Sequence, residues 1–172
     1  RAMAIELNED CLVFVNVEMA FITPGIRREV LLRLKRHESK LKLRERNLML
    51  TAQHTHSGPG GFSEYAYYSF TTPGFSKEIR NAFVAAIVKS ILTAYKNKVL
   101  AKLSYKEKAF DASVDVAWNR SLKAYNCNLE NKARKADSAQ ALDRRMYLMQ
   151  VDSKEGKVLG TINWFGVHAT AI

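Results

Sequence analysis

Two histidines separated by one residue are the sharpest chemical feature of the sequence. His54 and His56 stand where an apolar segment, residues 47–52, gives way to a glycine-rich stretch. In an extended segment, side chains two positions apart point the same way. The two imidazoles could therefore bind one metal ion, or one could bind it while the other lies beside a bound water. The alternative is a pair of structural histidines that hydrogen-bond loop carbonyls.

A third histidine and an arginine occupy similar places further along the chain. His168 follows the apolar residues 161–167, just as His54 follows residues 47–52. Ligands of a catalytic zinc often come from the ends of separate strands, so His168 is a candidate second ligand for an ion bound by His54, and a structural histidine is the alternative. Arg120 follows an alternating segment and could hold a carboxylate or stabilise an oxyanion with its planar, permanently charged fork. A surface salt bridge is the alternative for Arg120.

The loop after the first histidine pair has the composition of a binding site. It contains the glycines Gly58, Gly60 and Gly61, which would let a ligand approach the backbone closely. Aromatic residues follow them and could line the mouth of an apolar pocket, although core packing explains them almost as well: Phe62, Tyr65, Tyr67, Tyr68 and Phe70. The sequence has no nucleophile elbow around Ser57, no P-loop and no dinucleotide-binding glycine motif.

The segments that must position these residues alternate between strands and helices, which predicts an α/β fold of layered mixed sheets with flanking helices. Strand, helix and strand are predicted in that order over residues 12–17, 26–43 and 47–52, as a βαβ unit with Thr23 and Pro24 starting the helix. A second helix, capped by Ser76, runs to about residue 97. Further strands are predicted at residues 4–7, 101–106, 112–117, 145–151 and 157–167, with a hairpin turn at 153–156, a loop over 118–140, and a little helix around 130–136. No internal domain boundary is evident.

Composition limits the classes of protein to which the chain can belong. Its 172 residues are 47% hydrophobic and 26% charged, which suits a folded domain or part of a larger one. No apolar run approaches the ~20 residues that a membrane-spanning helix needs, and no signal peptide is visible. Two cysteines, Cys11 and Cys127, do not make a disulfide framework, and Cys11 is expected to be a buried thiol.

The net charge of +10 would attract polyanions. The basic residues gather at 27–46 and 96–108. A solvated helix face is the simplest interpretation of the first group, and a surface that meets anionic lipid or nucleic acid is the alternative. Zinc-finger spacing and aromatic RNA-binding motifs are lacking, so we expect no nucleic-acid partner.

Four blocks of sequence resemble the neutral ceramidase family, in the order and at about the spacing found there. They are His54-Thr55-His56-Ser57-Gly58-Pro59-Gly60-Gly61, Asn119-Arg120-Ser121, Asp143-Arg144-Arg145-Met146 and Trp164-Phe165-Gly166-Val167-His168-Ala169-Thr170. Residues 14–19 also resemble an early strand of the family, with Glu18 where the family more often has aspartate. The resemblance spans nearly the whole chain.

The resemblance implies a zinc-dependent amidohydrolase of sphingolipid metabolism that cleaves ceramide into sphingosine and a fatty acid. It implies that His54 and His168 bind Zn²⁺, and that His56 and Arg120 act around the zinc-bound water and the substrate. Gly58, Gly60, Gly61 and Phe62 would form part of the pocket wall. The family also implies a secreted, periplasmic or cell-surface location and, with the basic surface, peripheral contact with anionic membranes.

Parts of the family pattern do not occur in these 172 residues. They include a Gly-Asp-Val-Ser-Pro-Asn segment that carries a site serine, the glutamate and tyrosine that complete the zinc shell, and an Ig-like C-terminal domain. Residues 1–172 are therefore expected to be part of a catalytic domain, truncated at both ends, and inactive alone. The rival functions are another zinc hydrolase of esters, amides or phosphates, and a basic nucleic-acid-binding domain.

Overall fold

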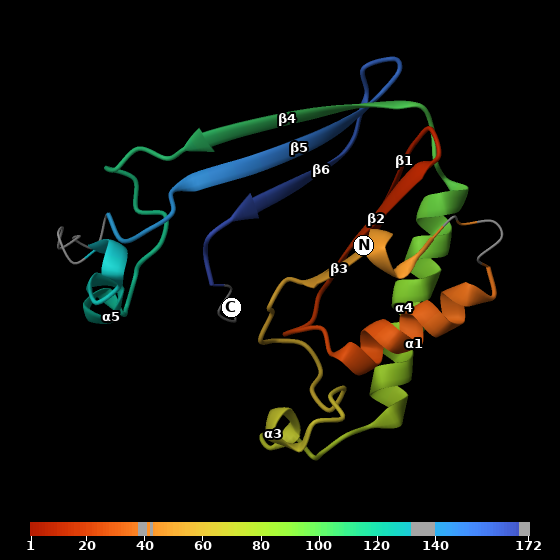
Figure 1. Cartoon of the computed structure of the whole chain (residues 1–172), viewed down its shortest axis with the longest axis horizontal. Helices are drawn as coiled ribbons and strands as arrows, with labels where there is room; N and C mark the ends of the chain where they lie inside the picture. The colour runs from red at the N-terminus through yellow and green to blue at the C-terminus, as the bar shows by residue number, and fades with distance from the viewer. Residues whose placement is uncertain (38–40, 42, 132–139, 169–172) are drawn as a thin grey trace. The chain divides into compact units, whose positions relative to one another are not determined.

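The structure is a computed structural model that describes residues 1–37, 41, 43–131 and 140–168. Its described residues form two compact units, Arg1–Lys98 and Val99–His168, each with its own three-stranded sheet (Figure 1). The predicted α/β class is confirmed. No internal boundary is evident in the sequence, so the division into two units was not predicted. None of the described helices is long and apolar enough to span a membrane.

The sheet of the first unit contains the predicted βαβ arrangement. Strand β1 (Ala2–Leu7) runs antiparallel to β2 (Asp10–Val17), and β2 runs parallel to β3 (Leu48–Ala52). Helix α1 (Pro24–Lys35) connects the two parallel strands. Because β2 is central, its side chains Cys11, Val13 and Val15 are buried at alternate positions on one face, which is the pattern of a strand covered by helices.

Helix α1 begins where predicted and ends earlier than predicted. The hydroxyl of Thr23 accepts a hydrogen bond from the Ile26 amide at 3.1 Å, and Pro24 is the first helical residue. The helix ends at Lys35 rather than at Leu43. Just after Lys35, the His37 amide donates to the Leu34 carbonyl. Leu41 and Leu43 are nevertheless buried, so the apolar spacing identified core residues correctly but extended the helix too far.

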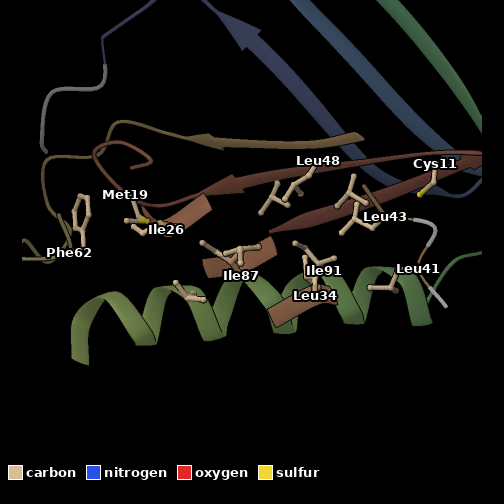
Figure 2. Packing of buried hydrophobic residues seen from close by; sticks show 14 residues of the cluster. Cys11, Met19, Ile26, Leu34, Leu41, Leu43, Leu48, Phe62, Ile87 and Ile91 are labelled. Carbon is tan, nitrogen blue, oxygen red and sulfur yellow. The ribbon is translucent and has the colours of Figure 1, made fainter. Parts of the chain in front are cut away.

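Helix α4 (Lys77–Lys96) supplies the other half of the core. The Ser76 hydroxyl caps it by accepting from the Ile79 amide at 3.2 Å, as predicted. The helix packs against α1, β1 and β2. Figure 2 shows the buried side chains of α4 lying between that helix and the strands of the sheet. The fully buried members of this layer are Val13, Val15, Ile26, Val30, Val84 and Ile91.

Short helices lie in the connections of the first unit. The 3₁₀ helix η1 (Glu45–Asn47) leads directly into β3, and α3 (Ala66–Ser69) lies in the glycine- and aromatic-rich segment between β3 and α4. That segment carries the His54–His56 pair, so the pair stands on the unit that contains the packed core.

The second unit is an antiparallel meander. Strand β5 (Arg145–Ser153) lies between β4 (Ala101–Ala109) and β6 (Val158–Phe165). The predicted hairpin turn joins β5 to β6, with Gly156 at a φ of 83°. Along these three strands no side chain is buried, and Ala141 is the one buried apolar residue among the described part of this unit. The sheet therefore contrasts with the covered sheet of the first unit.

Residues 112–117 do not form the predicted strand. Asp111 instead accepts hydrogen bonds from the backbone and the hydroxyl of Ser113, and the Arg144 guanidinium donates to the carbonyls of Asp111 and Val114. These bonds hold an irregular turn where a ladder would otherwise form. Helices α5 (Leu122–Asn126) and η2 (Leu129–Asn131) follow. Most of the helix predicted around residues 130–136 lies outside the described residues.

Candidate metal centre

His54 is held by main-chain bonds to the segment that follows β2. Its amide donates to the Met19 carbonyl at 3.0 Å, and the Gln53 amide donates to the Val17 carbonyl at 3.0 Å. The φ angle of His54 is 65°, in the left-handed region, which costs roughly 1–2 kcal/mol for a residue with a side chain. His54 is thus not in the extended conformation that was predicted, and the bonds to the buried Met19 segment stabilise the unusual backbone.

A backbone carbonyl determines which nitrogen of His54 can bind a metal. The Nδ1 atom lies 2.7 Å from the Ala20 carbonyl oxygen, which can only accept a hydrogen bond. Nδ1 therefore carries the proton, and the lone pair of the neutral ring lies on Nε2. A histidine that ligates a metal through one nitrogen usually donates from the other in this way. The arrangement prepares Nε2 of His54 for a metal.

His56 brings its own Nε2 to the same place. The Nε2 atoms of His54 and His56 are 3.2 Å apart, and the rings meet edge to face at an interplanar angle of 85°. Since His54 Nε2 is the acceptor, His56 Nε2–H donates to it. Two nitrogens at about 2.0–2.1 Å from a tetrahedral zinc would be separated by roughly 3.3 Å. The spacing of the pair therefore suits either two ligands of one ion or one ligand and a proton-carrying neighbour, and both rings are exposed.

The three glycines after the histidine pair differ in how much space the structure leaves for a side chain. Gly61 has a φ of 75°, and a Cβ there would lie 2.9 Å from the Gly74 carbonyl oxygen. A Cβ on Gly60 would meet the Thr72 side chain at 2.4 Å, whereas one on Gly58 would meet nothing closer than 3.6 Å. Gly60 and Gly61 thus allow the loop to pack closely on itself, and Gly58 lies in a roomier part of it.

The aromatic residues of this segment separate into core and surface. Phe62 is buried and packs against Phe21 and Phe83, with ring centroids 5.0 and 5.7 Å apart, and it lies near Met19 at one end of the core (Figure 2). Tyr67 and Phe70 are 87% and 88% exposed. The side chain of Phe62 therefore anchors the loop to the core. A part for it in a pocket wall stays a prediction.

A contact that the sequence did not suggest ties the loop to α1. The Thr23 hydroxyl donates to a carboxylate oxygen of Glu64 at 3.3 Å. The other carboxylate oxygen fills the space in which Gly25 would carry a Cβ, at 1.5 Å from that position. Glu64 thus lies against the N-terminus of α1, where a negative charge is favourable. No local sequence motif could have predicted that Glu64 packs on Gly25, because the two residues are far apart in the chain.

The second unit carries the other two predicted site residues. His168 is exposed and follows β6 after Gly166 and Val167, as the sequence placed it. Arg120 is exposed and lies just before α5, in a turn that Asn119 holds by accepting from the Ser121 amide and donating to the Ala141 carbonyl. In the part of the chain that the structure describes, no carboxylate pairs with the Arg120 guanidinium.

The acidic residues near these segments have other partners. Asp143 makes a two-pronged bond with Arg145, and this hydrogen bonding holds the pKa of the Asp143 carboxyl below its ordinary value. Glu18 lies 3.9 Å from the Arg1 guanidinium. Neither arrangement selects a carboxylate as a further metal ligand, so imidazoles remain the donor set that the described residues offer.

The whole chain matches a known enzyme family. The family described as neutral/alkaline non-lysosomal ceramidase, N-terminal, matches residues 1–172. The chain is 34% identical to the neutral ceramidase of Pseudomonas aeruginosa over 161 residues, which are 94% of this chain and 23% of that protein. It is 34% identical to the neutral ceramidase of Oryza sativa subsp. japonica over 170 residues, which are 97% of this chain and 20% of the relative.

Solved structures give the same result. The crystal structure of the neutral ceramidase from Pseudomonas aeruginosa is similar to this chain with a TM-score of 0.78, over 92% of this chain and 24% of that one. A second structure, described as ceramidase complexed with C2, gives a TM-score of 0.77 at 34% identity. The chain spans about a quarter or less of the length of the relatives that it matches. From its sequence and its fold, the chain belongs to the neutral/alkaline non-lysosomal ceramidase family.

Proposed function

We propose that this chain forms part of the catalytic domain of a zinc-dependent ceramidase, which hydrolyses the N-acyl bond of ceramide to sphingosine and a free fatty acid. Family membership supports the reaction class. The observation that carries the proposal is the His54–His56 pair, with Nε2 atoms 3.2 Å apart and Nδ1 of His54 anchored on the Ala20 carbonyl. The reaction would belong to ceramide catabolism, at a secreted, periplasmic or cell-surface location.

His54 and His168 are the proposed protein ligands of Zn²⁺ in this chain. His54 offers a lone pair on Nε2 because its Nδ1–H is committed to a carbonyl. The support for His168 comes from the sequence, since it follows an apolar strand as His54 does and stands in a block that resembles the family. Zinc bound by such ligands lowers the pKa of a coordinated water toward neutrality and polarises a carbonyl.

His56 and Arg120 are proposed to act on the substrate. His56 can hold or release a proton at Nε2, the atom that now donates to His54, and could pass it to the nitrogen of the departing sphingoid base. Arg120 carries a permanent charge and, among the described residues, faces no carboxylate, so it could stabilise negative charge on the substrate oxygen. The backbone of Gly58, Gly60 and Gly61 and the ring of Phe62 are proposed to shape the pocket wall.

A chimera tests the reaction. In it, these 172 residues replace the matched segment of the Pseudomonas aeruginosa neutral ceramidase, and fatty acid released from an N-acyl sphingoid base is measured. We expect hydrolysis by the chimera and none by the 172-residue chain alone, because the relatives are much longer. His54→Ala or His168→Ala should lower the rate by more than roughly 100-fold, and Arg120→Ala by about 100-fold or more.

His37→Ala is the matched control, because His37 is exposed and follows α1. Its rate should equal that of the unaltered chimera. A folded chimera that releases no fatty acid would contradict the proposed reaction. Full activity in the His54→Ala chimera would contradict the proposed site.

A further inference from the structure

A groove on the solvent side of α1 has no part in the proposed chemistry. Helix α1 and residues 43–45 enclose a cavity of about 360 Å³. Its walls are fixed to each other by Arg27, whose guanidinium donates to the Leu48 carbonyl at 3.0 Å and to the Glu45 carbonyl at 2.8 Å. The buried side chains of Leu34 and Leu43 also line it. The groove is therefore a feature of the packed core unit and is held by its fold.

The charges around this groove are mostly positive. Among the described residues, four cations line it, Arg27, Arg28, Lys35 and Arg44, together with one carboxylate, Glu45, which lies 3.9 Å from Arg27. Arg28, Lys35 and Arg44 are exposed, and within the described residues none of them pairs with a carboxylate. Three cations held around one cavity, with no acidic partner in the described part of the chain, favour an anionic occupant, because an anion would relieve their mutual repulsion.

The same groove is partly apolar. Leu31 is half-buried in its wall, and Leu32 is 50% exposed between the cations of the helix. Arg28, Leu31, Leu32 and Lys35 fall at helical spacings of three and four, so they share one face. A nucleic-acid backbone would use the cations and leave the leucines in water, whereas the interface of an anionic bilayer accepts both.

We propose that the groove formed by α1 and residues 43–45 docks the protein on the surface of an anionic phospholipid bilayer. Arg28, Lys35 and Arg44 receive the lipid phosphates, and the exposed Leu32 enters the region beneath the headgroups. The choice of a bilayer as the occupant rests on the proposed function, because a ceramide substrate resides in membranes. The docking step itself needs neither zinc nor ceramide.

Flotation of the 172-residue chain with vesicles measures this docking. The vesicles contain either phosphatidylcholine alone or phosphatidylcholine with phosphatidylglycerol in equal amounts, and neither contains ceramide. We expect binding to the anionic vesicles alone, weakening as salt rises. The variant R28Q/K35Q/R44Q should bind on the order of 100-fold more weakly, since each surface cation contributes roughly fivefold.

The matched control removes the same charge from the other basic segment. Lys102, Lys106 and Lys108 are exposed on one face of β4, and K102Q/K106Q/K108Q leaves the groove untouched. It should retain binding within about threefold. L32S should weaken binding several-fold while the salt dependence remains. Circular dichroism and thermal unfolding confirm that each variant is folded.

Several outcomes would overturn the proposal. Equal losses in the two triple variants would show that binding follows net charge alone. Displacement by millimolar inorganic phosphate would indicate a small-anion site. Tighter binding to duplex DNA than to the vesicles, unaffected by L32S, would indicate a nucleic-acid surface. Because these assays contain no substrate, vesicle binding as expected with no hydrolysis by the chimera would reject only the ceramidase function. Hydrolysis by the chimera without binding to the anionic vesicles would reject only the docking surface.

Discussion

The two units of this chain carry their site residues on very different supports. The His54–His56 pair follows β3, whose sheet is covered by α1 and α4 through fully buried valines and isoleucines. Arg120 and His168 belong to a unit whose three strands bury no side chain, with Leu103 and Tyr105 45% and 60% exposed. The second sheet is instead held by its ladders and by ring pairs such as Tyr105 with Tyr147.

The two units therefore differ in how firmly they hold a proposed site residue. Bonds to Met19 and Ala20 hold His54 rigidly, because Met19 is part of the core. A sheet without buried side chains opens at lower free energy, since little apolar surface is exposed when its strands separate. Amide hydrogen exchange should therefore be slower in β2 and α4 than in β4 and β6.

The largest expected effect is on the core of the first unit. Ile91→Ala deletes a fully buried side chain of α4 and should lower the free energy of unfolding by about 2–5 kcal/mol. Ile162→Ala makes the same change in the half-buried centre of β6 and should cost less than about 1.5 kcal/mol. Urea denaturation measures both, and equal losses would remove the distinction between the units.

The loop beside the histidine pair tests whether tight packing extends to the site. Gly61→Ala places a Cβ 2.9 Å from the Gly74 carbonyl oxygen at a positive φ, and should destabilise the first unit by about 1–3 kcal/mol. Gly58→Ala is the control, because its Cβ finds ordinary contacts, and it should change stability by less than about 0.5 kcal/mol. Equal unfolding temperatures for Gly61→Ala and Gly58→Ala would contradict the close packing of the loop around Gly61.

Helix caps give a smaller contrast of the same kind. The Ser76 hydroxyl accepts from the Ile79 amide at the start of α4, so Ser76→Ala should cost about 1 kcal/mol. Ser121 precedes α5 but makes no side-chain cap bond, so Ser121→Ala should cost less than about 0.5 kcal/mol. Thermal unfolding of the two variants provides the measurement. A larger loss for Ser121→Ala would reverse the expected order.

A partly buried polar contact gives the first unit a pH dependence. The Tyr95 hydroxyl donates to the Leu41 carbonyl and accepts from the Cys11 thiol, and burial raises the pKa of Tyr95 above its ordinary value. The neutral Tyr95 phenol stabilises the folded state fully below pH ~10, where the phenol of the unfolded chain is neutral too. Above that pH the unfolded chain loses its phenol proton more readily than the folded chain, so this stabilisation falls as the pH rises.

Tyr95→Phe should lower the free energy of unfolding by about 1 kcal/mol at neutral pH through loss of the hydrogen bond. Above pH ~10 the variant should lose stability less steeply with pH than the unaltered chain. Parallel stability curves for the two proteins in that range would contradict the assignment. Urea midpoints measured from pH 8 to 11 make the comparison.

Local signals predicted much of the fold. Thr23, Pro24 and Ser76 start helices because their side chains or ring favour helix starts, and that preference is readable from sequence. The early end of α1 escaped prediction, because the apolar spacing continues past Lys35. The turn at residues 111–114 also escaped prediction, because the guanidinium of the distant Arg144 donates to backbone carbonyls there. The alternation of residues 112–117 indicated a strand that these bonds prevent.

The site was predictable in its residue types and not in its geometry. The spacing of His54 and His56 indicated that the two rings could serve one metal ion or hydrogen-bond loop carbonyls, and the structure places their Nε2 atoms 3.2 Å apart with Nδ1 of His54 on a carbonyl. The left-handed backbone of His54 and the contact of its Nδ1 with the Ala20 carbonyl depend on main-chain atoms that carry no sequence signal. The same holds for Glu64 against Gly25, which joins residues far apart in the chain.

Zinc binding by the 172-residue chain tests the central proposal most directly, and the four histidines supply both the variants and the control. Competition with a chromophoric chelator should reveal one zinc per chain, bound much more weakly in His54→Ala and His168→Ala. His37→Ala should bind as the unaltered chain does. Unchanged zinc affinity in both His54→Ala and His168→Ala, with each variant folded, would contradict the proposed metal centre.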